Sequence, residues 1–323
     1  MEIIFLGTSS GTPTKTRNVS SIVIRKHHAK QWSLIDCGEG TQHQILHTNL
    51  SFKYLDTIYI THIHGDHCYG LPGLLASATM AGRIEPLSIV APLAVKVFLE
   101  TMQMHTELRL SFDIDFIVVE EYNKLYERED FCISIVPLSH RVPSWGYLFE
   151  EKGIEIKLDT QKLLEDNIPK GVIWGEIQKS SEVCLENGKT IQSKTYYLPQ
   201  RKARKIAISG DNDTPSIWGN IEDIDLLVHE ATYTDEMAKK AENTGHSTVK
   251  KVAMFAEDYG VKNLILTHFS PRYQTDVVHS NAVPEIEVEA EKYYHANLGL
   301  AHDFALFHLD KQLEMHYQNI HQD

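Results

Sequence analysis

The stretch Thr61-His62-Ile63-His64-Gly65-Asp66-His67 places four potential metal ligands within six residues. It follows an apolar segment, residues 55–59, that predicts a buried strand. Four such ligands on one short loop cannot all face a single tetrahedral ion. They can serve two neighbouring ions, one bound by His62 and His64 and the other by Asp66 and His67. Imidazole nitrogen and carboxylate oxygen suit zinc, and a ligand set without cysteine argues against a closed structural site.

Three further ligands follow other predicted strands. His140 comes after residues 131–137, Asp211 after residues 205–209 and His268 after residues 263–266. Since such strand ends gather along one edge of a sandwich, His140 would join His62 and His64, and His268 would join Asp66 and His67. Asp211 would bridge the two ions. The alternative for each residue alone is a capping group or an exposed loop side chain.

The rest of the chain alternates predicted strands and helices, which indicates an α/β protein of the αβ/βα sandwich type. Its 323 residues suffice for one large domain, which we assign to residues 1–150 and 206–315. Apolar periodicity fades over residues 151–205, which we interpret as an inserted arm. Residues 316–323 are expected to be a C-terminal tail.

Charge and cysteine usage restrict the function further. The net charge is −13, so the whole chain is no general polyanion binder, but residues 151–205 carry 11 lysines and arginines against 8 acidic residues. The four cysteines are scattered without a CxxC pair, which favours a reducing, cytoplasmic compartment. The sequence contains no apolar stretch near the ~20 residues that cross a bilayer, so no membrane association is expected.

Several motifs together carry a resemblance to a known family. His-x-His-x-Asp-His, followed by the later His, Asp and His, is similar to the signature of the metallo-β-lactamase superfamily. More narrowly, the chain resembles ribonuclease Z, the family of tRNA 3′-processing endonucleases, from residue 1 to about residue 309. The segments that carry this narrower resemblance are Phe5-Leu6-Gly7-Thr8-Ser9, Pro13-Thr14-Lys15-Thr16-Arg17-Asn18 (the PxKxRN loop), Leu34-Ile35-Asp36-Cys37-Gly38-Glu39-Gly40, His229-Glu230-Ala231-Thr232 (the HEAT loop), Gly245-His246-Ser247-Thr248 (the HST motif) and His268-Phe269-Ser270-Pro271-Arg272-Tyr273.

The resemblance implies roles for residues beside the metal ligands. Asp66 would accept a proton from the attacking water, His246 would protonate the leaving 3′-oxygen, and Glu230 would orient His246. The residues implied in binding RNA are Lys15 and Arg17 of the PxKxRN loop, Ser270 and Arg272 at the edge of the site, and Pro169, Lys170 and Gly171 in the arm. The arm departs from the family pattern because Val172, not proline, follows Gly171.

The resemblance therefore implies a metallo-β-lactamase fold with a protruding tRNA-binding arm. It implies two Zn²⁺ ions per chain, with Mn²⁺ or Co²⁺ as possible substitutes, and hydrolysis that leaves a 3′-hydroxyl on the tRNA and a 5′-phosphate on the trailer. A homodimer is expected, since dimers are usual in the family. The alternatives are a small-molecule hydrolase of the same superfamily and a metal-dependent binding protein without turnover. The five histidines near the C-terminus have no assigned role: His295, His302, His308, His316 and His321.

Overall fold

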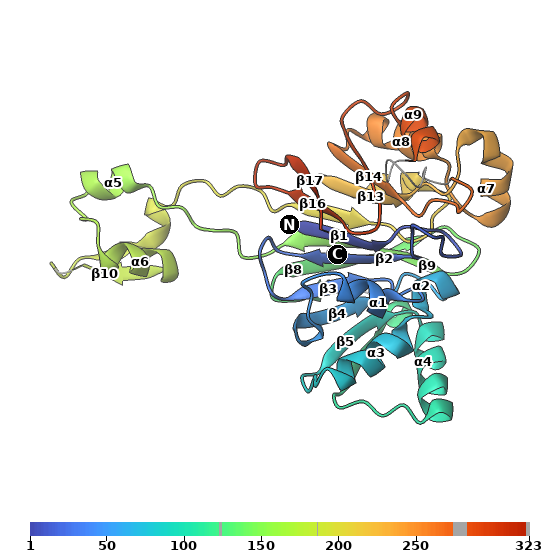
Figure 1. Ribbon diagram of the computed structural model, residues 1–323. Helices are drawn as coiled ribbons and strands as arrows, with labels where there is room; N and C mark the ends of the chain where they lie inside the picture. The colour runs from blue at the N-terminus through green and yellow to red at the C-terminus, as the bar shows by residue number, and fades with distance from the viewer. Residues whose placement is uncertain (123–124, 186, 274–282, 321–323) are drawn as a thin grey trace. The chain divides into compact units, whose positions relative to one another are not determined.

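The computed structural model describes residues 1–122, 125–185, 187–273 and 283–320 (Figure 1). The described chain divides into two compact units, Met1–Glu150 with Arg204–Asp323 and, separately, Glu151–Ala203. The second unit corresponds closely to the segment expected to be an inserted arm. None of the helices in these described ranges is long and apolar enough to cross a membrane.

The first unit contains two large sheets. One has the strand order β17-β16-β1-β2-β3-β4-β5-β6 and the other the order β15-β14-β13-β12-β9-β8-β7. The strands of the first sheet are β1 (Glu2–Gly7), β2 (Ser21–Arg25), β3 (Trp32–Ile35), β4 (Leu55–Tyr59), β5 (Leu87–Ala91), β6 (Ile114–Val118), β16 (Ala305–Leu309) and β17 (Met315–Asn319). Those of the second are β7 (Tyr126–Glu127), β8 (Phe131–Leu138), β9 (Ser144–Glu151), β12 (Lys205–Ile208), β13 (Leu226–Glu230), β14 (Asn263–Thr267) and β15 (Asn297–Leu300).

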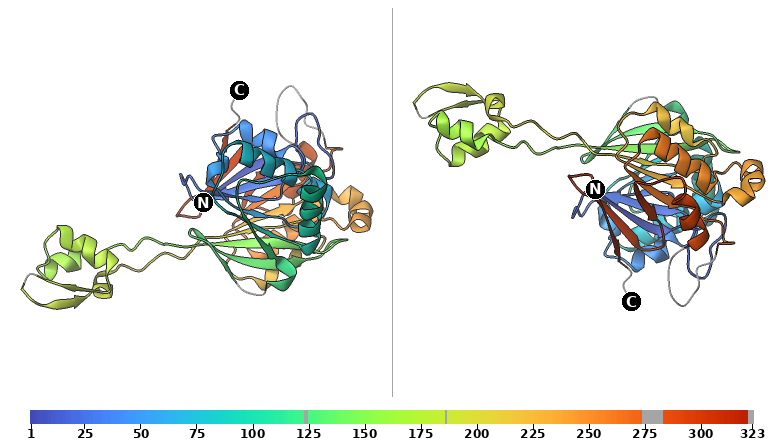
Figure 2. Two further views of the ribbon diagram at one scale, coloured as in Figure 1. Left: turned by 90° about the horizontal axis from the view of Figure 1, so that it is seen from below. Right: turned by 90° about the horizontal axis from the view of Figure 1, so that it is seen from above.

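Helices cover the outer face of each sheet, as both views in Figure 2 show. On the first sheet they are α1 (Thr41–Leu46), α2 (Gly65–Cys68), α3 (Leu71–Met80) and α4 (Leu93–Thr106). On the second sheet they are α7 (Ala238–Thr244), α8 (Val249–Tyr259) and α9 (Pro284–Ala290). The four layers are therefore helix, sheet, sheet and helix, which confirms the predicted αβ/βα class.

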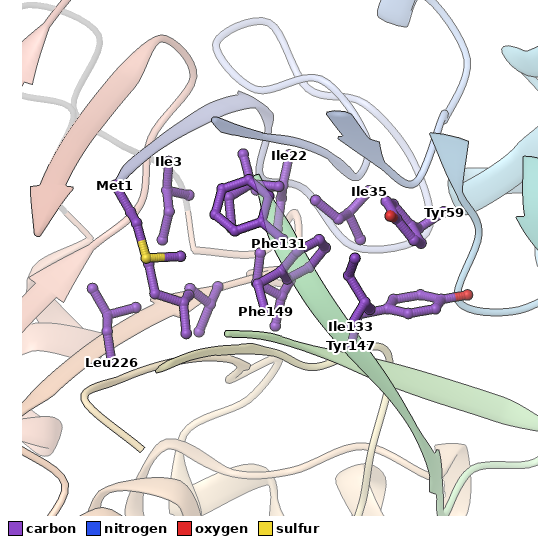
Figure 3. Close-up of a cluster of buried hydrophobic side chains, with 14 of the residues drawn as sticks. Met1, Ile3, Ile22, Ile35, Tyr59, Phe131, Ile133, Tyr147, Phe149 and Leu226 are labelled. Carbon is purple, nitrogen blue, oxygen red and sulfur yellow. The ribbon is translucent and has the colours of Figure 1, made fainter. Parts of the chain in front are cut away.

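The core between the sheets explains why both sheets have apolar inner faces. Ile3, Ile22 and Ile35 from the first sheet face Phe131 and Phe149 from the second (Figure 3). β1 is buried over its whole length because it lies between β2 and β16. The apolar run at residues 3–6 is thus a central strand, as its composition indicates.

The C-terminal boundary differs from the expectation of a tail. Residues 316–319 belong to β17, which pairs antiparallel with β16 from Ala305↔Asn319 to Leu309↔Met315. β17 is an edge strand, and four of its five residues are exposed, so backbone hydrogen bonds rather than apolar burial hold it. His321 lies outside the described residues.

The second unit has its own small core. It consists of α5 (Thr160–Glu165), α6 (Val172–Lys179), β10 (Glu182–Cys184) and β11 (Thr190–Gln192), around the buried side chains of Leu163, Ile177 and Tyr196. Trp174 Nε1 donates to the backbone oxygen of Ile168 at 3.1 Å, just before the exposed Pro169-Lys170-Gly171 turn. This bond fixes the turn to α6 of the same unit.

Candidate metal centre

The loop between β4 and α2 positions the first ligands. The backbone N–H and the hydroxyl of Thr61 donate to the carboxylate of Asp36 at 2.8 and 2.9 Å. Gly38 permits the close approach of α2, because a Cβ atom there would lie 2.4 Å from the backbone oxygen of Asp66. Gly38 therefore allows α2 to place Asp66 and His67 beside the loop that carries His62 and His64.

A first group of donor atoms comes from His62, His64, His140 and Asp211, which lie close enough together to hold one ion. His64 Nδ1 lies 3.0 Å from His62 Nε2 and 3.2 Å from His140 Nε2. Asp211 Oδ2 lies 3.6 Å from His62 Nε2 and 3.7 Å from His140 Nε2. The structure thus brings together the ligands predicted for the first ion.

A second group comes from Asp66, His67 and His268. His67 Nε2 and His268 Nε2 are 3.2 Å apart, and Asp66 Oδ2 lies 3.4 and 3.3 Å from these two nitrogens. Asp211 Oδ1 lies 3.5 Å from His67 Nε2 and 3.4 Å from His268 Nε2. Asp211 therefore turns one oxygen toward each group.

These spacings fit metal ligands. Four ligands at about 2.0–2.1 Å from a zinc ion lie about 3.3 Å from one another. The pairs of donor atoms given above are 3.0 to 3.7 Å apart, a range that brackets this value. In the neutral ring of His140, Nδ1 donates to the backbone oxygen of Gly245, so Nε2 is an acceptor, and it faces His64 Nδ1 at 3.2 Å. A shared cation resolves this crowding of acceptors.

The outward nitrogen of each of four histidines contacts an oxygen atom, which fixes the ring. This is the usual arrangement around metal-binding histidines. The contacts are His62 Nδ1 to Thr61 Oγ1 at 2.9 Å, His67 Nδ1 to Asp36 Oδ2 at 2.7 Å, His140 Nδ1 to the oxygen of Gly245 at 2.6 Å and His268 Nδ1 to Thr232 Oγ1 at 3.0 Å. Asp36 and Thr232 were not among the predicted site residues, although both lie in segments that carry the family resemblance.

The protonation states of His62, His64, Asp66 and Asp211 agree with this use, whereas a metal ion would have to displace a proton from His67. Burial, together with neighbouring imidazoles, lowers the pKa of His62 and His64, so both rings are neutral ligands at pH 7. Burial would raise the pKa of Asp66 and of Asp211, but the surrounding histidines outweigh it and lower both. Both carboxylates are therefore charged. Burial would lower the pKa of His67, but Asp211, Asp66 and Asp36 raise it well above its usual value.

Glu230 and His246 form a pair beside these groups. His246 Nδ1 lies 3.2 Å from Glu230 Oε1 and 3.7 Å from Asp211 Oδ2. Glu230 is fixed at both oxygens, because Ser247 N–H donates to Oε1 at 2.8 Å and the Thr232 hydroxyl donates to Oε2 at 2.8 Å. Burial would lower the pKa of His246, but Glu230 and Asp211 raise it to about 9. His246 is therefore protonated at neutral pH.

A cavity of about 390 Å³ opens onto the centre. Its wall includes His64, Asp66, Asp211 and His246, so donor atoms of both groups and the Glu230 partner are accessible from one opening. The opposite wall comes from residues 10–13, where the Gly11 N–H donates to Asp66 Oδ2 at 2.6 Å. A substrate group that enters this cavity meets carboxylates, imidazoles and a fixed loop.

The sequences of known proteins agree with this geometry. Ribonuclease Z from Pseudomonas putida strain GB-1 is 44% identical over 313 residues, which are 96% of this chain and 98% of that protein. The chain belongs to the ribonuclease Z family. It is accordingly a hydrolytic endoribonuclease of the metallo-β-lactamase type.

Solved structures and a family model extend the comparison. Human tRNase Z, short form, has a TM-score of 0.65 and 27% identity, covering 96% of this chain and 100% of that one. The metallo-β-lactamase fold protein YhfI from Bacillus subtilis has a TM-score of 0.62 at 15% identity, covering 94% and 98%, and shows the fold alone. A family model described as Anti-Pycsar protein Apyc1 matches residues 1–169. That segment includes His62–His67 and His140 but not Asp211 or His268, whereas the ribonuclease Z relative spans the whole set.

Arg17, which the resemblance to ribonuclease Z predicts to bind RNA, is not available to RNA. Arg17 is only 4% exposed, and its guanidinium donates to the backbone oxygens of Ser270 and Tyr273 at 3.4 and 2.6 Å. The prediction for Arg17 is therefore wrong, because its side chain is buried and hydrogen-bonded to the backbone of the same chain. Ser270 is buried to 7% exposure, while Lys15 and Arg272 are exposed. Arg272 lies over the ring of Tyr233 at 5.8 Å.

Proposed function

We propose that this chain is a two-zinc endoribonuclease that removes the 3′ trailer from precursor tRNA. The observation that carries the proposal is Asp211, whose two carboxylate oxygens face two separate groups of ligand atoms. His62, His64 and His140 would hold one ion, Asp66, His67 and His268 the other, and Asp211 both. When bound, the two ions supply Lewis acidity that neutralises the phosphate and makes water more acidic.

The side chains of the centre would then carry out the proton transfers. Asp66 accepts a proton from the attacking water, and His246 donates one to the 3′-oxygen as its bond to phosphorus breaks. Glu230 keeps His246 protonated and oriented. The tRNA keeps a 3′-hydroxyl and the trailer keeps a 5′-phosphate.

The second unit supports a large substrate rather than a small one. Its exposed lysines are Lys157, Lys170, Lys179, Lys189, Lys194 and Lys202. We propose that they bind tRNA phosphates together with Lys15 and Arg272, and that Pro169, Lys170 and Gly171 form part of the contact. A thioester or lactone substrate would leave this surface unused.

The experiment that tests the proposal is end mapping on precursor tRNA with zinc-loaded protein. We expect one cut at the 3′ side of the tRNA body, a trailer with a 5′-phosphate, and close to two metal ions per chain in the centre. Asp211→Ala should lose both ions, whereas His140→Ala should retain the ion of Asp66, His67 and His268. Hydrolysis of thioesters or lactones without cleavage of precursor tRNA would contradict the proposal and favour the small-molecule hydrolase.

Two further expectations belong to this proposal. A homodimer would let the arm of one subunit contact tRNA at the site of its partner, which light scattering and cross-linking can test. The cytoplasm is the compartment we propose, because the four cysteines in the described chain are all free.

A further inference from the structure

A second group of imidazoles and carboxylates lies on the first sheet, outside the candidate metal centre. The strand register places Glu2 of β1 opposite His308 of β16, and His308 opposite His316 of β17. Directly opposed residues of antiparallel strands project from the same face, so these side chains form one row. Arg25 of β2 continues the row on the other side of Glu2.

The turn after β2 adds two histidines to this row. His27 Nδ1 lies 2.7 Å from Glu2 Oε1, and the ring centroids of His27 and His28 are 3.6 Å apart. His28 has a φ angle of 60°, in the left-handed region that few residues with a side chain adopt. Donor atoms of Glu2, His27 and His28 all lie within 4.8 Å of one another.

His308 supports this group but is not one of its ligands. Its ring is stacked on that of His27, with centroids 3.9 Å apart and planes 10° from parallel. The nitrogen lone pairs of two parallel stacked rings cannot converge on one ion, because they lie in parallel planes. His316 is turned toward Asp310, with Nε2 3.0 Å from Oδ2.

We propose that Glu2, His27 and His28 form a third, peripheral binding site for a divalent transition-metal ion such as Zn²⁺. Two imidazoles and one carboxylate are a typical ligand set for such an ion, with water at the remaining positions. Binding replaces the hydrogen bond between His27 and Glu2, whose 2.7 Å is shorter than the ~3.3 Å between zinc ligands. The ring of His27 must also turn relative to that of His28, since their planes are only 37° from parallel at a centroid distance of 3.6 Å, and the 42% exposure of His27 permits this movement.

The charges around Glu2 predict a weaker site than the candidate metal centre. Arg25 Nε holds Glu2 Oε2 at 2.5 Å, which leaves Oε1 for the ion but also places a positive charge beside it. Burial would raise the pKa of Glu2, but Arg25 and the hydrogen bonds to the carboxylate lower it, so the ligand is charged at neutral pH. In the described part of the chain, the two carboxylates of the candidate metal centre pair with histidines and with no arginine. The peripheral ion should therefore dissociate first.

The test is equilibrium dialysis of the untagged full chain against a series of free zinc concentrations, followed by elemental analysis. The wild type should bind a third equivalent at higher free zinc than the first two. The double variant His27→Gln/His28→Gln should bind one equivalent of zinc fewer than the wild type. His295→Gln is the matched control, because His295 is also an exposed histidine against a carboxylate, 3.1 Å from Glu257, but lies outside the group. It should bind like the wild type.

The readout is the difference of one equivalent between wild type and variant, so it does not depend on whether the proposed nuclease function is correct. An unchanged zinc titration of the double variant overturns the proposal. If the double variant loses all zinc, the single variant His28→Gln provides the test of the site. Losing this exposed ligand should weaken the weakest equivalent at least about tenfold, as much as losing a supporting residue of a metal site. No change in that single variant would likewise refute the site.

Discussion

His246 is set apart from the metal ligands by its contact with Glu230. Its Nδ1 faces a carboxylate that is itself fixed by Ser247 and Thr232, so the ring has a defined orientation and a proton to give. We expect His246→Ala to lower turnover of precursor tRNA by about 10²–10⁴-fold, the range for general acid catalysis. Metal content should stay near that of the wild type.

The leaving group distinguishes this role from a structural one. A nitrophenyl phosphodiester has a leaving group that needs no proton, so His246→Ala should slow its hydrolysis much less than it slows tRNA cleavage. Single-turnover rates on both substrates measure the difference. Equal losses on the two substrates would remove His246 from the role of general acid.

Glu230 sets the pH range in which His246 is protonated. The proximity of Glu230 and Asp211 raises the pKa of His246 to about 9, above its usual value, despite burial. Activity should therefore fall as the pH rises through this pKa. In Glu230→Gln one negative charge is gone, the pKa of His246 falls, and the alkaline limb of kcat should move to lower pH. Bound cations near Asp211 act in the same direction in both proteins.

The profile of kcat against pH at saturating zinc measures this shift. Glu242→Gln is the control, because Glu242 is an exposed carboxylate of α7 near the same loop and makes no contact with His246 among the bonds that the structure describes. An alkaline limb that stays in place in Glu230→Gln would contradict the pairing.

The residues of the candidate metal centre could be selected from the sequence, because both their chemistry and their positions after apolar segments are visible there. The buried position of Arg17 could not be predicted in this way. Its motif resembles an RNA-binding loop, but only the structure shows that Ser270 and Tyr273 accept its hydrogen bonds. Asp36 and Thr232 were missed for a related reason, since outer contacts of histidines depend on segments far apart in the chain.

At the scale of elements, hydrogen bonds to Asp303 hold the loop of residues 8–18, part of which lines the cavity at the candidate metal centre. Asp303 Oδ1 accepts from the Thr8 hydroxyl at 2.8 Å, and Oδ2 accepts from Asn18 N–H at 2.6 Å and from Gln44 Nε2 at 2.9 Å. These bonds hold both ends of the segment whose Gly11 N–H contacts Asp66. Burial, only partly offset by its hydrogen bonds, raises the pKa of Asp303 to about 7.

This shift predicts a pH dependence of stability. Because the folded-state pKa is above the unfolded value of about 4, the folded protein holds an extra proton between these pH values. The contribution of Asp303 to stability is therefore fully present below pH ~4 and lost as the pH rises to ~7, with a slope of at most ~1.4 kcal/mol per pH unit. The free energy of unfolding of metal-free Asp303→Asn should lack this fall.

Urea unfolding of wild type and variant from pH 4 to 8 measures the difference. Asp310→Asn is the control, because the hydrogen bond from His316 lowers the pKa of Asp310 to about 2, so its contribution changes only below pH ~4 and its curve should parallel that of the wild type in this range. Its contribution is lost as the pH falls, not as it rises. Parallel curves for wild type and Asp303→Asn would show that Asp303 is ionised throughout.

Elements with a strong apolar pattern were predicted with nearly correct bounds, as with residues 55–59, 131–137 and 263–266. Those without one were not. The sequence predicts a tail where the structure has β17, because this strand is largely exposed. It also gives no helical pattern for α2, which has only four residues and includes Gly65. Hydrogen bonding to a neighbouring strand or loop forms such elements, and a single sequence does not display it.

At the scale of the whole molecule, the separate second unit predicts a separable function. Deleting residues 155–194 removes most of its core and five of its six exposed lysines, while the first unit retains its two sheets and the candidate metal centre. We expect the deletion to weaken binding of precursor tRNA and to spare hydrolysis of a small phosphodiester. The salt dependence of tRNA binding should become shallower by about one unit per lost phosphate contact.

Filter binding at several salt concentrations measures both effects. A variant with Lys170, Lys179 and Lys189 changed to Gln is the matched control, since it keeps the fold of the unit and removes three charges. It should show a smaller decrease of the slope. Unchanged binding and slope in the deletion would leave tRNA recognition to the first unit, where Lys15 is the exposed residue to test.

The spacing of the ligands along the chain also has a consequence for biosynthesis. His67 and His268 are 201 positions apart, and β1 lies between β2 and β16, with Glu2 opposite His308. A nascent chain that has emerged through residue 150 carries five of the seven ligands but neither Asp211 nor His268. Its first sheet also lacks the last two strands, β16 and β17. Since metal affinity depends on a folded site, tight metal uptake should await translation of Asp211, His268 and the two strands β16 and β17. The nuclease centre is therefore completed only after β16 has paired with β1 and β17 with β16.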